Sequence, residues 1–341
     1  MLLIHPMPGL PDRDRVRLLY ILAASHSGST LLAMLLGSHP DVCTVGEMKH
    51  TSIGDVNRYR CSCGALIREC PFWTAVADDV RSQGIDFEVG RGLTDFATHA
   101  PSRAKRLLKP LHRGRALEWA RDAALASVPG WRQHYATVQA RNAALAAAVC
   151  RRSGRRIIVD SSKIGVRLKF LLRNPRFDVR IVRLVRDGRA VALTYMDPAL
   201  YADATNPERR GGGHGGSRDA ERLPLERAAH EWRRSNEEAA LLLRTVNRDR
   251  WLELRYEDLC ADPASTLATA FAFAGVDPSK ASTDFRAHQH HVVGNGMRLD
   301  ATSEIRLDAR WRTALGQGDL VRFEAVAGDL NRQLGYAQVT A

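Results

Sequence analysis

Several features are scarce or missing in this chain of 341 residues, and each absence narrows the class of protein. No run of 18 apolar residues occurs, so we expect no transmembrane helix. Residues 1–15 lack the basic start, apolar middle and small-residue cleavage site of a signal peptide, which favours a cytoplasmic protein. Aromatic residues are few, at 6%, beside 45% hydrophobic residues, a composition typical of a soluble globular protein. This length predicts one large domain or two small ones.

Lysine is also scarce, because only six of the fifty cationic residues are Lys, but the net charge of +12 is strongly basic. A basic chain favours anionic ligands such as nucleotides or sulfated and phosphorylated substrates. The charges are spread along the chain, and no basic block interleaved with aromatics occurs. This pattern argues against a nucleic-acid partner.

Cysteine is too sparse for a disulfide scaffold, with six residues in the chain. Three of them cluster at Cys61, Cys63 and Cys70, with His50 upstream, and three thiols with an imidazole could bind zinc. The Cys-x-Cys spacing differs from the usual Cys-x2-Cys knuckle. The sequence therefore favours a reduced, partly buried loop or a redox-sensitive pair without a metal. Zinc binding and a disulfide remain open as alternatives.

The most informative segment is 16–47, where an apolar strand pattern over 18–23 leads into a small polar loop and then an apolar helix pattern. The loop consists of Ser25, His26, Ser27, Gly28, Ser29 and Thr30. A strand that feeds such a loop into a helix N-terminus is typical of an anion-binding site, although a tight turn without a ligand has the same pattern. An ATP-binding loop would need Gly, four further residues and then Gly-Lys-Ser/Thr. Here Ala23 stands at the position of the first Gly, and Ser29 stands at the position of the Lys. The loop therefore suits a phosphate better than a nucleoside triphosphate with magnesium.

Strand and helix patterns alternate through the remaining chain and predict an α/β fold with three layers and a central, mostly parallel sheet. Strands are expected at 17–24, 156–160, 179–185 and 251–254, and helices at 28–37, 187–195, 225–246, 264–274 and 317–334. Residues 38–70 read as loop. Segment 71–152 reads as a helical insertion or cap within a single domain, and the Gly-rich segment 203–222 as a mobile loop.

Four short segments together resemble a sulfotransferase that uses 3′-phosphoadenosine 5′-phosphosulfate (PAPS). They are the loop 25–32, Gly46-Glu47, the strand–helix junction 186–190 (Arg-Asp-Gly-Arg-Ala), and 256–259 (Tyr-Glu-Asp-Leu). The resemblance implies that the loop binds the 5′-phosphosulfate and that Arg186 and Thr194 bind the 3′-phosphate. A local alternative for Arg186 and Arg189 is an ion pair with Asp187 at the start of the helix.

The resemblance also implies roles for four side chains in sulfuryl transfer, an in-line displacement that leaves adenosine 3′,5′-bisphosphate and needs no metal. His26 stands where the family carries Lys or Arg, and it would supply a cation only when protonated. Lys163 follows a strand directly and could share that role. Glu47 is the expected base for the acceptor, and Arg298 a candidate for the family's C-terminal basic loop.

Two other functions remain open on the sequence alone. The strand at 156–160 ends in Asp160, which in a P-loop kinase or NTPase could hold magnesium. A non-enzymatic module that binds polyanions would also suit the basic charge. For a sulfotransferase, the acceptor could be a sugar hydroxyl or amine, a lipid or a small natural product, and the sequence specifies neither the acceptor nor the oligomeric state.

Overall fold

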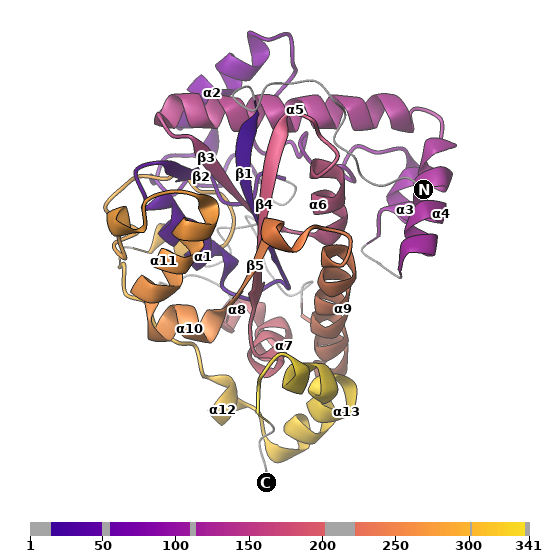
Figure 1. The fold of residues 1–341 in the computed structure, drawn as a ribbon, viewed down its shortest axis with the longest axis vertical. Helices are drawn as coiled ribbons and strands as arrows, with labels where there is room; N and C mark the ends of the chain where they lie inside the picture. Colours follow the sequence, from indigo (N-terminus) through magenta and orange to yellow (C-terminus); the bar gives the residue numbers. More distant parts are fainter. Residues whose placement is uncertain (1–14, 50–54, 110–113, 202–221, 301, 338–341) are drawn as a thin grey trace.

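The centre of the molecule is a five-stranded sheet in which all paired strands are parallel (Figure 1). The computed structural model describes residues 15–49, 55–109, 114–201, 222–300 and 302–337. The strands lie in the order β2-β3-β1-β4-β5. Their bounds are β1 Val16–Ala23, β2 Val42–Thr44, β3 Ile157–Lys163, β4 Phe177–Val185 and β5 Trp251–Arg255. The predicted α/β class with a parallel central sheet is confirmed.

Strand β1 occupies the middle of the sheet because its side chains are apolar on both faces. Leu18, Tyr20 and Leu22 belong to one hydrophobic core, whereas Leu19 and Ile21 belong to another on the opposite face. Alternate side chains of a strand point to opposite faces. A strand that is buried on both sides is typical of parallel sheets covered by helices.

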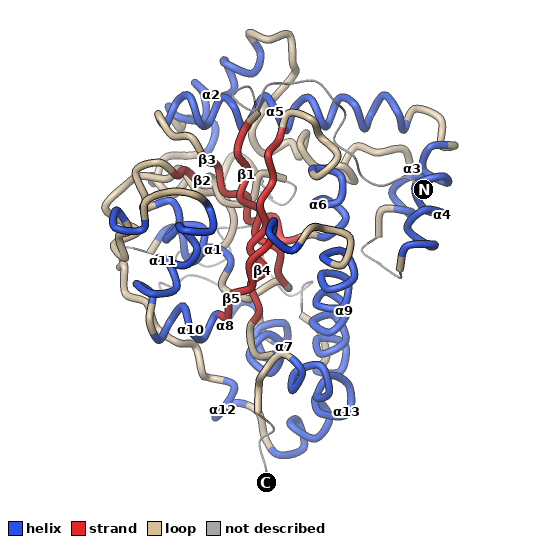
Figure 2. The backbone as a smooth tube through the Cα atoms, viewed as in Figure 1, coloured by secondary structure: helices blue, strands red, loops and turns tan. Residues whose placement is uncertain are grey.

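Helices cover both faces of the sheet and give the three layers expected from the sequence (Figure 2). On one face lie α1 (Ser29–Gly37) and α11 (Pro263–Ala274), which pack against each other. On the other face lie α6 (Gly165–Leu171) and α9 (Leu225–Leu243). Figure 1 shows the strands running from the region of α5 towards α7 and α10.

The segment predicted as a helical insertion contains α2 (Pro71–Arg81), α3 (Ser102–Leu107), α4 (Arg115–Ala126) and α5 (Trp131–Ser153). Helix α5 packs against β1, β2 and β3. Its apolar residues, such as Leu145, share one core with Leu18 of β1 and Ile158 of β3. The last part of this segment is therefore a layer of the central fold and not a separate cap.

The remaining helices lie mostly towards the carboxyl ends of the strands. They are α7 (Gly188–Met196), α8 (Pro198–Tyr201), α10 (Tyr256–Ala261), α12 (Trp311–Ala314) and α13 (Gln317–Gln333). Helices α7, α9 and α13 pack together around Trp232 and Phe323. Strand β2 lies inside the stretch expected to be loop, because a strand of three residues leaves no periodic signal. Of the predicted mobile loop 203–222, residues 203–221 lie outside the described residues.

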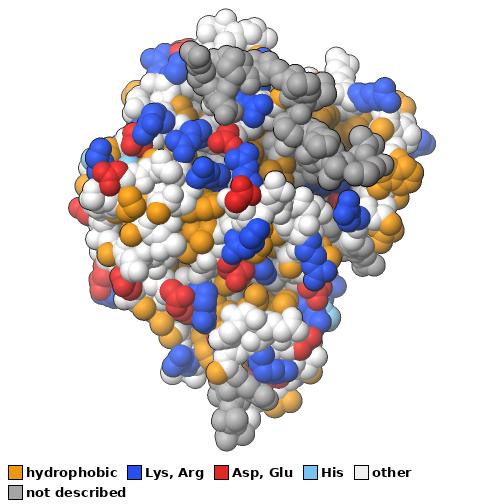
Figure 3. Space-filling model, viewed as in Figure 1, with side chains coloured by type: hydrophobic (Ala, Val, Ile, Leu, Met, Phe, Trp, Pro, Cys, Tyr) orange, Lys and Arg blue, Asp and Glu red, His pale blue; other side chains and the backbone are white. Residues whose placement is uncertain are grey.

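Two surface properties bear on the expected partners. Within the described ranges, none of the helices combines the length and the apolar character that crossing a bilayer requires. On the face shown in Figure 3, Lys and Arg side chains are interspersed with Asp and Glu.

Candidate active site

The predicted site residues gather where the parallel strands end. The loop 24–28 follows β1, Glu47 follows β2, Lys163 ends β3, and Arg186 follows β4. Ligands of open α/β sheets bind beyond the carboxyl ends of the strands, where the strand order reverses. Here the chain moves from β1 to one side of the sheet for β2 and β3 and to the other side for β4. The loop after β1 therefore occupies that reversal point.

The loop after β1 presents unpaired polar groups at the start of α1. Gly28 is the N-cap residue with φ 86°, His26 also has a positive φ of 62°, and the first turn of α1 holds no acidic residue. The first N–H groups of a helix have no partner inside the helix and carry partial positive charge. The hydroxyl of Ser27 is 1% exposed and has no hydrogen-bond partner among the described residues. An anion at this loop would satisfy these groups.

The Tyr256 ring joins the loop to Arg186. A Cβ atom built on Gly28 would lie 2.8 Å from Cε2 of Tyr256, so only glycine fits between the loop and the ring. The other neighbour of the ring is the Arg186 guanidinium, whose Cζ lies 4.4 Å from the ring centroid. The sequence analysis identified the Tyr-Glu-Asp-Leu segment but not this packing role. The role depends on a contact between the loop after β1 and Tyr256, which follows β5 directly.

Arg186 lies directly beside the loop after β1. Its Nη1 donates a hydrogen bond to the backbone carbonyl of His26 at 2.7 Å, and its Nη2 donates to a carboxylate oxygen of Asp308 at 2.9 Å. Its Nε is buried without a partner among the described residues. The indole of Trp232 donates to the Arg186 carbonyl at 3.2 Å and fixes the backbone there. The sequence could not indicate Asp308, because the two residues are 122 positions apart.

The local ion pair considered for this junction forms with Arg189 rather than with Arg186. Asp187 caps α7 by accepting the backbone N–H of Arg189, and its carboxylate also accepts from the Arg189 guanidinium at 2.7 Å. The guanidinium lies over the ring of Trp311, with Cζ 4.1 Å from the centroid. Arg189 therefore stabilises the start of α7, and Arg186 points to the loop.

Thr194 and Arg298 make their hydrogen bonds away from the loop after β1. Thr194 is buried two turns along α7, and its hydroxyl donates to the Ala190 carbonyl at 2.9 Å. Arg298 is 0% exposed, and its guanidinium donates to the backbone carbonyls of Arg60 and Gly294. Arg298 therefore joins the loop that contains Arg60 to the loop that contains Gly294.

Glu47 and Lys163 form an ion pair across the ends of β2 and β3. The Lys163 ammonium donates to Oε1 of Glu47, and the ammonium of Lys49 lies 3.5 Å from Oε2. Burial of the carboxyl would raise its pKa, but the two ammonium groups outweigh it and lower the pKa of Glu47 from the ordinary 4.5 to about 2. Glu47 is therefore ionised at neutral pH, and as long as Lys163 is paired with it, it is a weak base.

An irregularity in β3 sets the direction of Lys163. Tyr20 pairs with Asp160 and Leu22 with Lys163, so β3 contains one more residue than β1 over this step. Such bulges often re-aim side chains near active sites. Lys163 also has a positive φ of 68°, which is uncommon for a residue with a side chain. The backbone is thus held in an unusual conformation at the point where the ammonium meets Glu47.

A buried network that the sequence analysis did not identify supports this backbone. Asp160 accepts hydrogen bonds from the N–H groups of Met48 and Ser162 and pairs with Arg167, whose Nη2 is 3.1 Å from Oδ2. Asp160 and Arg167 are 0% and 1% exposed. Buried charges persist in proteins when they are paired and hydrogen-bonded. Both segments that carry the ion pair are therefore tied to one carboxylate.

The His26 ring leaves the loop on the side of α7. It makes an edge-to-face contact with Tyr195, with the ring centroids 4.6 Å apart. Ser29 and Thr30 form the first turn of α1, and Ser25 lines a neighbouring cavity. The loop predicted from the sequence therefore leads directly into the N-terminus of α1.

A cavity of about 570 Å³ opens beside Ser25 and Lys163. Part of its wall comes from the segment between β2 and β3, including residues 95–98 and Lys105 of α3. The opposite wall comes from α9, with Glu231, Arg234, Ser235 and Glu238. Its size is in the range of small-molecule sites.

A second cavity of about 480 Å³ lies beside Asp308, the ion-pair partner of Arg186. Its lining includes Asp187, Arg189, Asp308 and Trp311. Asp308 thus connects this cavity to the guanidinium of Arg186.

Comparison with known proteins agrees with the resemblance found in the sequence. The profile of the sulfotransferase family matches residues 19–280. Carbohydrate sulfotransferase 5 of Mus musculus is 32% identical over 178 residues, which cover 50% of this chain and 44% of that protein. Carbohydrate sulfotransferase 6 of Homo sapiens is 26% identical over 361 residues, covering 99% of this chain and 85% of that protein. Among solved structures, sulfotransferase STF9 from Mycobacterium avium is similar, with 12% identity, a TM-score of 0.48, and coverage of 95% of this chain and 78% of that one.

The family profile spans most of the chain and includes the loop after β1, Glu47, Lys163 and Arg186. The chain belongs to the sulfotransferase family. Its match to the mouse carbohydrate sulfotransferase spans less than half of that protein.

Proposed function

We propose that this chain transfers a sulfuryl group from PAPS to a hydroxyl or amine of an acceptor and releases adenosine 3′,5′-bisphosphate. The observation that carries the proposal is the contact between Arg186 and the loop after β1, through the 2.7 Å hydrogen bond to His26. Two elements that we assign to anion binding lie side by side at the strand ends, within a chain of the sulfotransferase family. A donor with phosphate groups at two ends fits such a pair.

Unsatisfied polar atoms support the fit of this donor. The Ser27 hydroxyl and the Nε of Arg186 are both buried and have no partner among the described residues. Buried polar groups are normally hydrogen-bonded, so these atoms indicate a site for an anionic ligand. The loop, with the N–H groups at the start of α1, would hold the 5′-phosphosulfate, and Arg186 with Thr194 the 3′-phosphate.

The donor supplies the reactive sulfuryl group, and the chain supplies charge and orientation. We assign Lys163 and His26 to stabilise the charge that develops around that group, as fixed cations do in related transfers. Glu47 would take the proton of the acceptor. Its base strength depends on Lys163, because its pKa is about 2 while the two ammonium groups face it. A Lys163 side chain that turned towards the donor would leave Glu47 a stronger base.

The 570 Å³ cavity next to Lys163 is our candidate for the acceptor site, because its wall begins where Lys163 ends β3. Four charged residues of its lining could each form hydrogen bonds with hydroxyl groups: Lys49, Asp95, Glu231 and Arg234. The names of the similar proteins point in the same direction, since they are carbohydrate sulfotransferases. We therefore favour a carbohydrate or another polyhydroxylated acceptor over a lipid.

The observations speak against a kinase that holds magnesium through Asp160. Both carboxylate oxygens of Asp160 already accept hydrogen bonds, from backbone N–H groups and from Arg167. The loop also carries Ser29 where an ATP-binding loop has Lys.

The test is transfer of labelled sulfate from PAPS to a panel of glycans, lipids and small hydroxylated compounds, with product identification by mass. Adenosine 3′,5′-bisphosphate should raise the melting temperature without magnesium, because a ligand that binds only the folded state stabilises it. A shift with ATP and magnesium, but none with the bisphosphate, would contradict the proposal. Steep salt-dependent binding of any polyanion without transfer would instead support a non-enzymatic module.

A further inference from the structure

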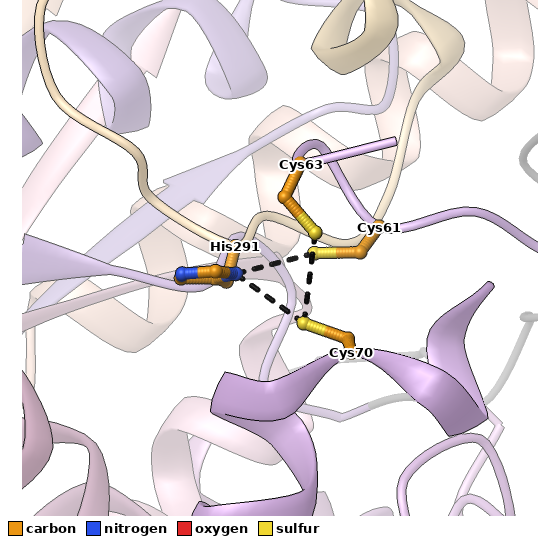
Figure 4. Close-up of side chains that lie close together, drawn as sticks. All are labelled: Cys61, Cys63, Cys70 and His291. Atoms are coloured by element: carbon orange, nitrogen blue, oxygen red, sulfur yellow. Dashed lines mark hydrogen bonds between the residues drawn. The ribbon is translucent and has the colours of Figure 1, made fainter. Parts of the chain in front are cut away.

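Three cysteines and one histidine meet at a place that the proposed transfer does not use (Figure 4). Cys61 and Cys63 lie in a turn after residue 60, Cys70 is the N-cap residue of α2, and His291 comes from a loop more than 200 positions later. Their four ligand atoms, three Sγ and Nδ1 of His291, all lie within 4.8 Å of one another. Figure 4 shows these side chains pointing towards a common centre.

The separations match those around a tetrahedral metal ion. The Sγ atoms of Cys63 and Cys70 are 3.7 Å apart, and Nδ1 of His291 lies 3.3 Å from Sγ of Cys70 and 3.7 Å from Sγ of Cys61. With Zn–S near 2.3 Å and Zn–N near 2.0–2.1 Å, the edges of a tetrahedron are about 3.8 Å for S···S and about 3.6 Å for S···N. A disulfide would bring two sulfurs to about 2.0 Å.

We propose that Cys61, Cys63, Cys70 and His291 bind one structural zinc ion. Four protein ligands close the coordination sphere, which is characteristic of structural zinc rather than of catalytic zinc with an open position. Soft thiolates with one imidazole select zinc among the common divalent ions. The fourth ligand is thus His291 instead of His50, which lies outside the described residues. This proposal replaces, for this cluster, the expectation from the sequence that no metal is bound. The ion has a structural role and takes no part in sulfuryl transfer.

The surroundings of the cluster hold its ligands in place. The His291 ring is stacked on Phe72 with the centroids 4.4 Å apart, and the Trp73 indole donates to the His291 carbonyl at 3.1 Å. Cys61 and Cys70 are completely buried. Cys70 stands at the N-terminus of α2, whose partial positive charge favours a sulfur that carries negative charge as a ligand. Oriented ligands of this kind strengthen metal binding.

A zinc ion here would fasten the segment that carries Glu47. Two residues after His291, Val293 forms a parallel bridge with Gly46, and its carbonyl accepts the backbone N–H of Glu47 at 3.4 Å. The turn with Cys61 and Cys63 is joined to the same loop, because the Ser62 N–H donates to the Val292 carbonyl at 3.3 Å. The ion would connect the segment 61–70 with His291, which lies more than 200 positions later, and its presence does not depend on the proposed function.

The first test is the metal content of the full chain, purified without chelator and dialysed. We expect one zinc per chain in the wild type and in Cys150→Ser, and none in Cys70→Ser. Cys150 is a matched control because its Sγ lies 3.9 Å from that of Cys43, in a cysteine pair outside the cluster. Wild-type chain without zinc, with iron in its place, or with an intact Cys63–Cys70 disulfide by mass spectrometry, would overturn the proposal.

A second test covers the case in which Cys70→Ser does not fold. His291→Cys keeps four metal ligands and should retain zinc, whereas His291→Ala should lose it on dialysis. After replacement by Co²⁺, the wild type and His291→Cys should show the intense visible absorption of tetrahedral cobalt with thiolate ligands. Equal zinc retention by His291→Ala and the wild type, or a spectrum typical of octahedral cobalt, would contradict the assigned ligands.

Discussion

The guanidinium of Arg186, after β4, donates a hydrogen bond to the backbone carbonyl of His26, after β1, at 2.7 Å. This bond connects the two parts of the chain that the sequence analysis assigned to opposite ends of one donor. It also means that a change at Arg186 affects both the charge available to a phosphate and the shape of the loop.

We predict that Arg186→Ala weakens the binding of adenosine 3′,5′-bisphosphate by roughly 1.5–3 kcal/mol, the scale of a hydrogen bond to a charged group. Isothermal titration calorimetry measures this difference. Arg189→Ala, next on the same junction, removes a guanidinium paired with Asp187, so it should lower stability more than affinity. Equal affinity of the Arg186→Ala variant and the wild type would remove Arg186 from the donor site.

Asp308 competes with a phosphate for the same guanidinium, because its carboxylate lies 2.9 Å from Nη2 of Arg186. Burial raises the pKa of Asp308, but hydrogen bonding and charge from Arg310 and Arg186 lower it to about 2. The group is therefore an anion at neutral pH. We predict that Asp308→Asn binds the bisphosphate several-fold more tightly, as measured by calorimetry. Weaker binding would show that Asp308 organises the site instead of competing with the ligand.

The ion pair of Glu47 and Lys163 gives a prediction for pH dependence. The pKa of Glu47 is lowered in the folded chain, so its pairing stabilises the fold at pH values above about 4.5 and is lost as the pH falls towards 2. In Lys163→Met the pKa should rise towards its ordinary value. We expect that variant to lose less stability than the wild type between pH 5 and pH 3, as judged by denaturant unfolding.

The control for this measurement is Lys105→Met, because Lys105 lines the same cavity as Lys163, whereas the cations that lower the pKa of Glu47 are Lys163 and Lys49. Its loss of stability over the same pH range should equal that of the wild type. If Lys163→Met also behaves like the wild type, the ion pair does not determine the protonation of Glu47.

Gly28 gives a stability prediction with an internal comparison. Both Gly28 and Gly84 have a positive φ, 86° and 74°, but a Cβ atom at Gly28 would meet the Tyr256 ring, whereas at Gly84 it meets no atom within 4 Å. Gly84→Ala should cost about 1 kcal/mol from the backbone alone, and Gly28→Ala more than that, about 2–4 kcal/mol. Denaturant unfolding measures both variants, and equal losses would contradict the packing role of Tyr256.

The buried pair of Asp160 and Arg167 gives the largest expected loss of stability. Arg167→Met leaves the carboxylate of Asp160 without its cation and should cost about 3–5 kcal/mol. Arg152→Met breaks the pair with Asp79 on the surface and should cost far less, because exposed ion pairs contribute little to stability. A loss at Arg167 as small as that at Arg152 would show that Asp160 needs no charged partner.

The sequence predicted those parts of the fold and site that depend on neighbouring residues. Strand β1, the loop with Gly28 and the start of α1 follow from an apolar strand, small residues and an apolar helix pattern. Lys163 and Arg186 could be placed at the sheet edge because each follows a strand directly. The match of these segments to the family profile is consistent with such local signals.

The parts that were missed depend on contacts between distant residues. Asp308 and His291 reach their partners from the last quarter of the chain, and no spacing in the sequence indicates either contact. Arg298 was expected at the nucleotide because it lies in a late polar cluster, but it is buried between Arg60 and Gly294. The polar character of a segment does not indicate whether its side chains lie at the surface or, like Arg298, in the interior.

The wall of the larger cavity formed by residues 95–98 and α3 has a consequence for how this chain could diversify. Those residues come from the stretch between β2 and β3, whereas the loop after β1 and Arg186 come from elsewhere in the chain. Substitutions or length changes confined to that stretch can reshape one compartment and leave the other intact. For the proposed transfer, new acceptor preferences could therefore evolve, or be engineered by segment exchange, without rebuilding the proposed donor site.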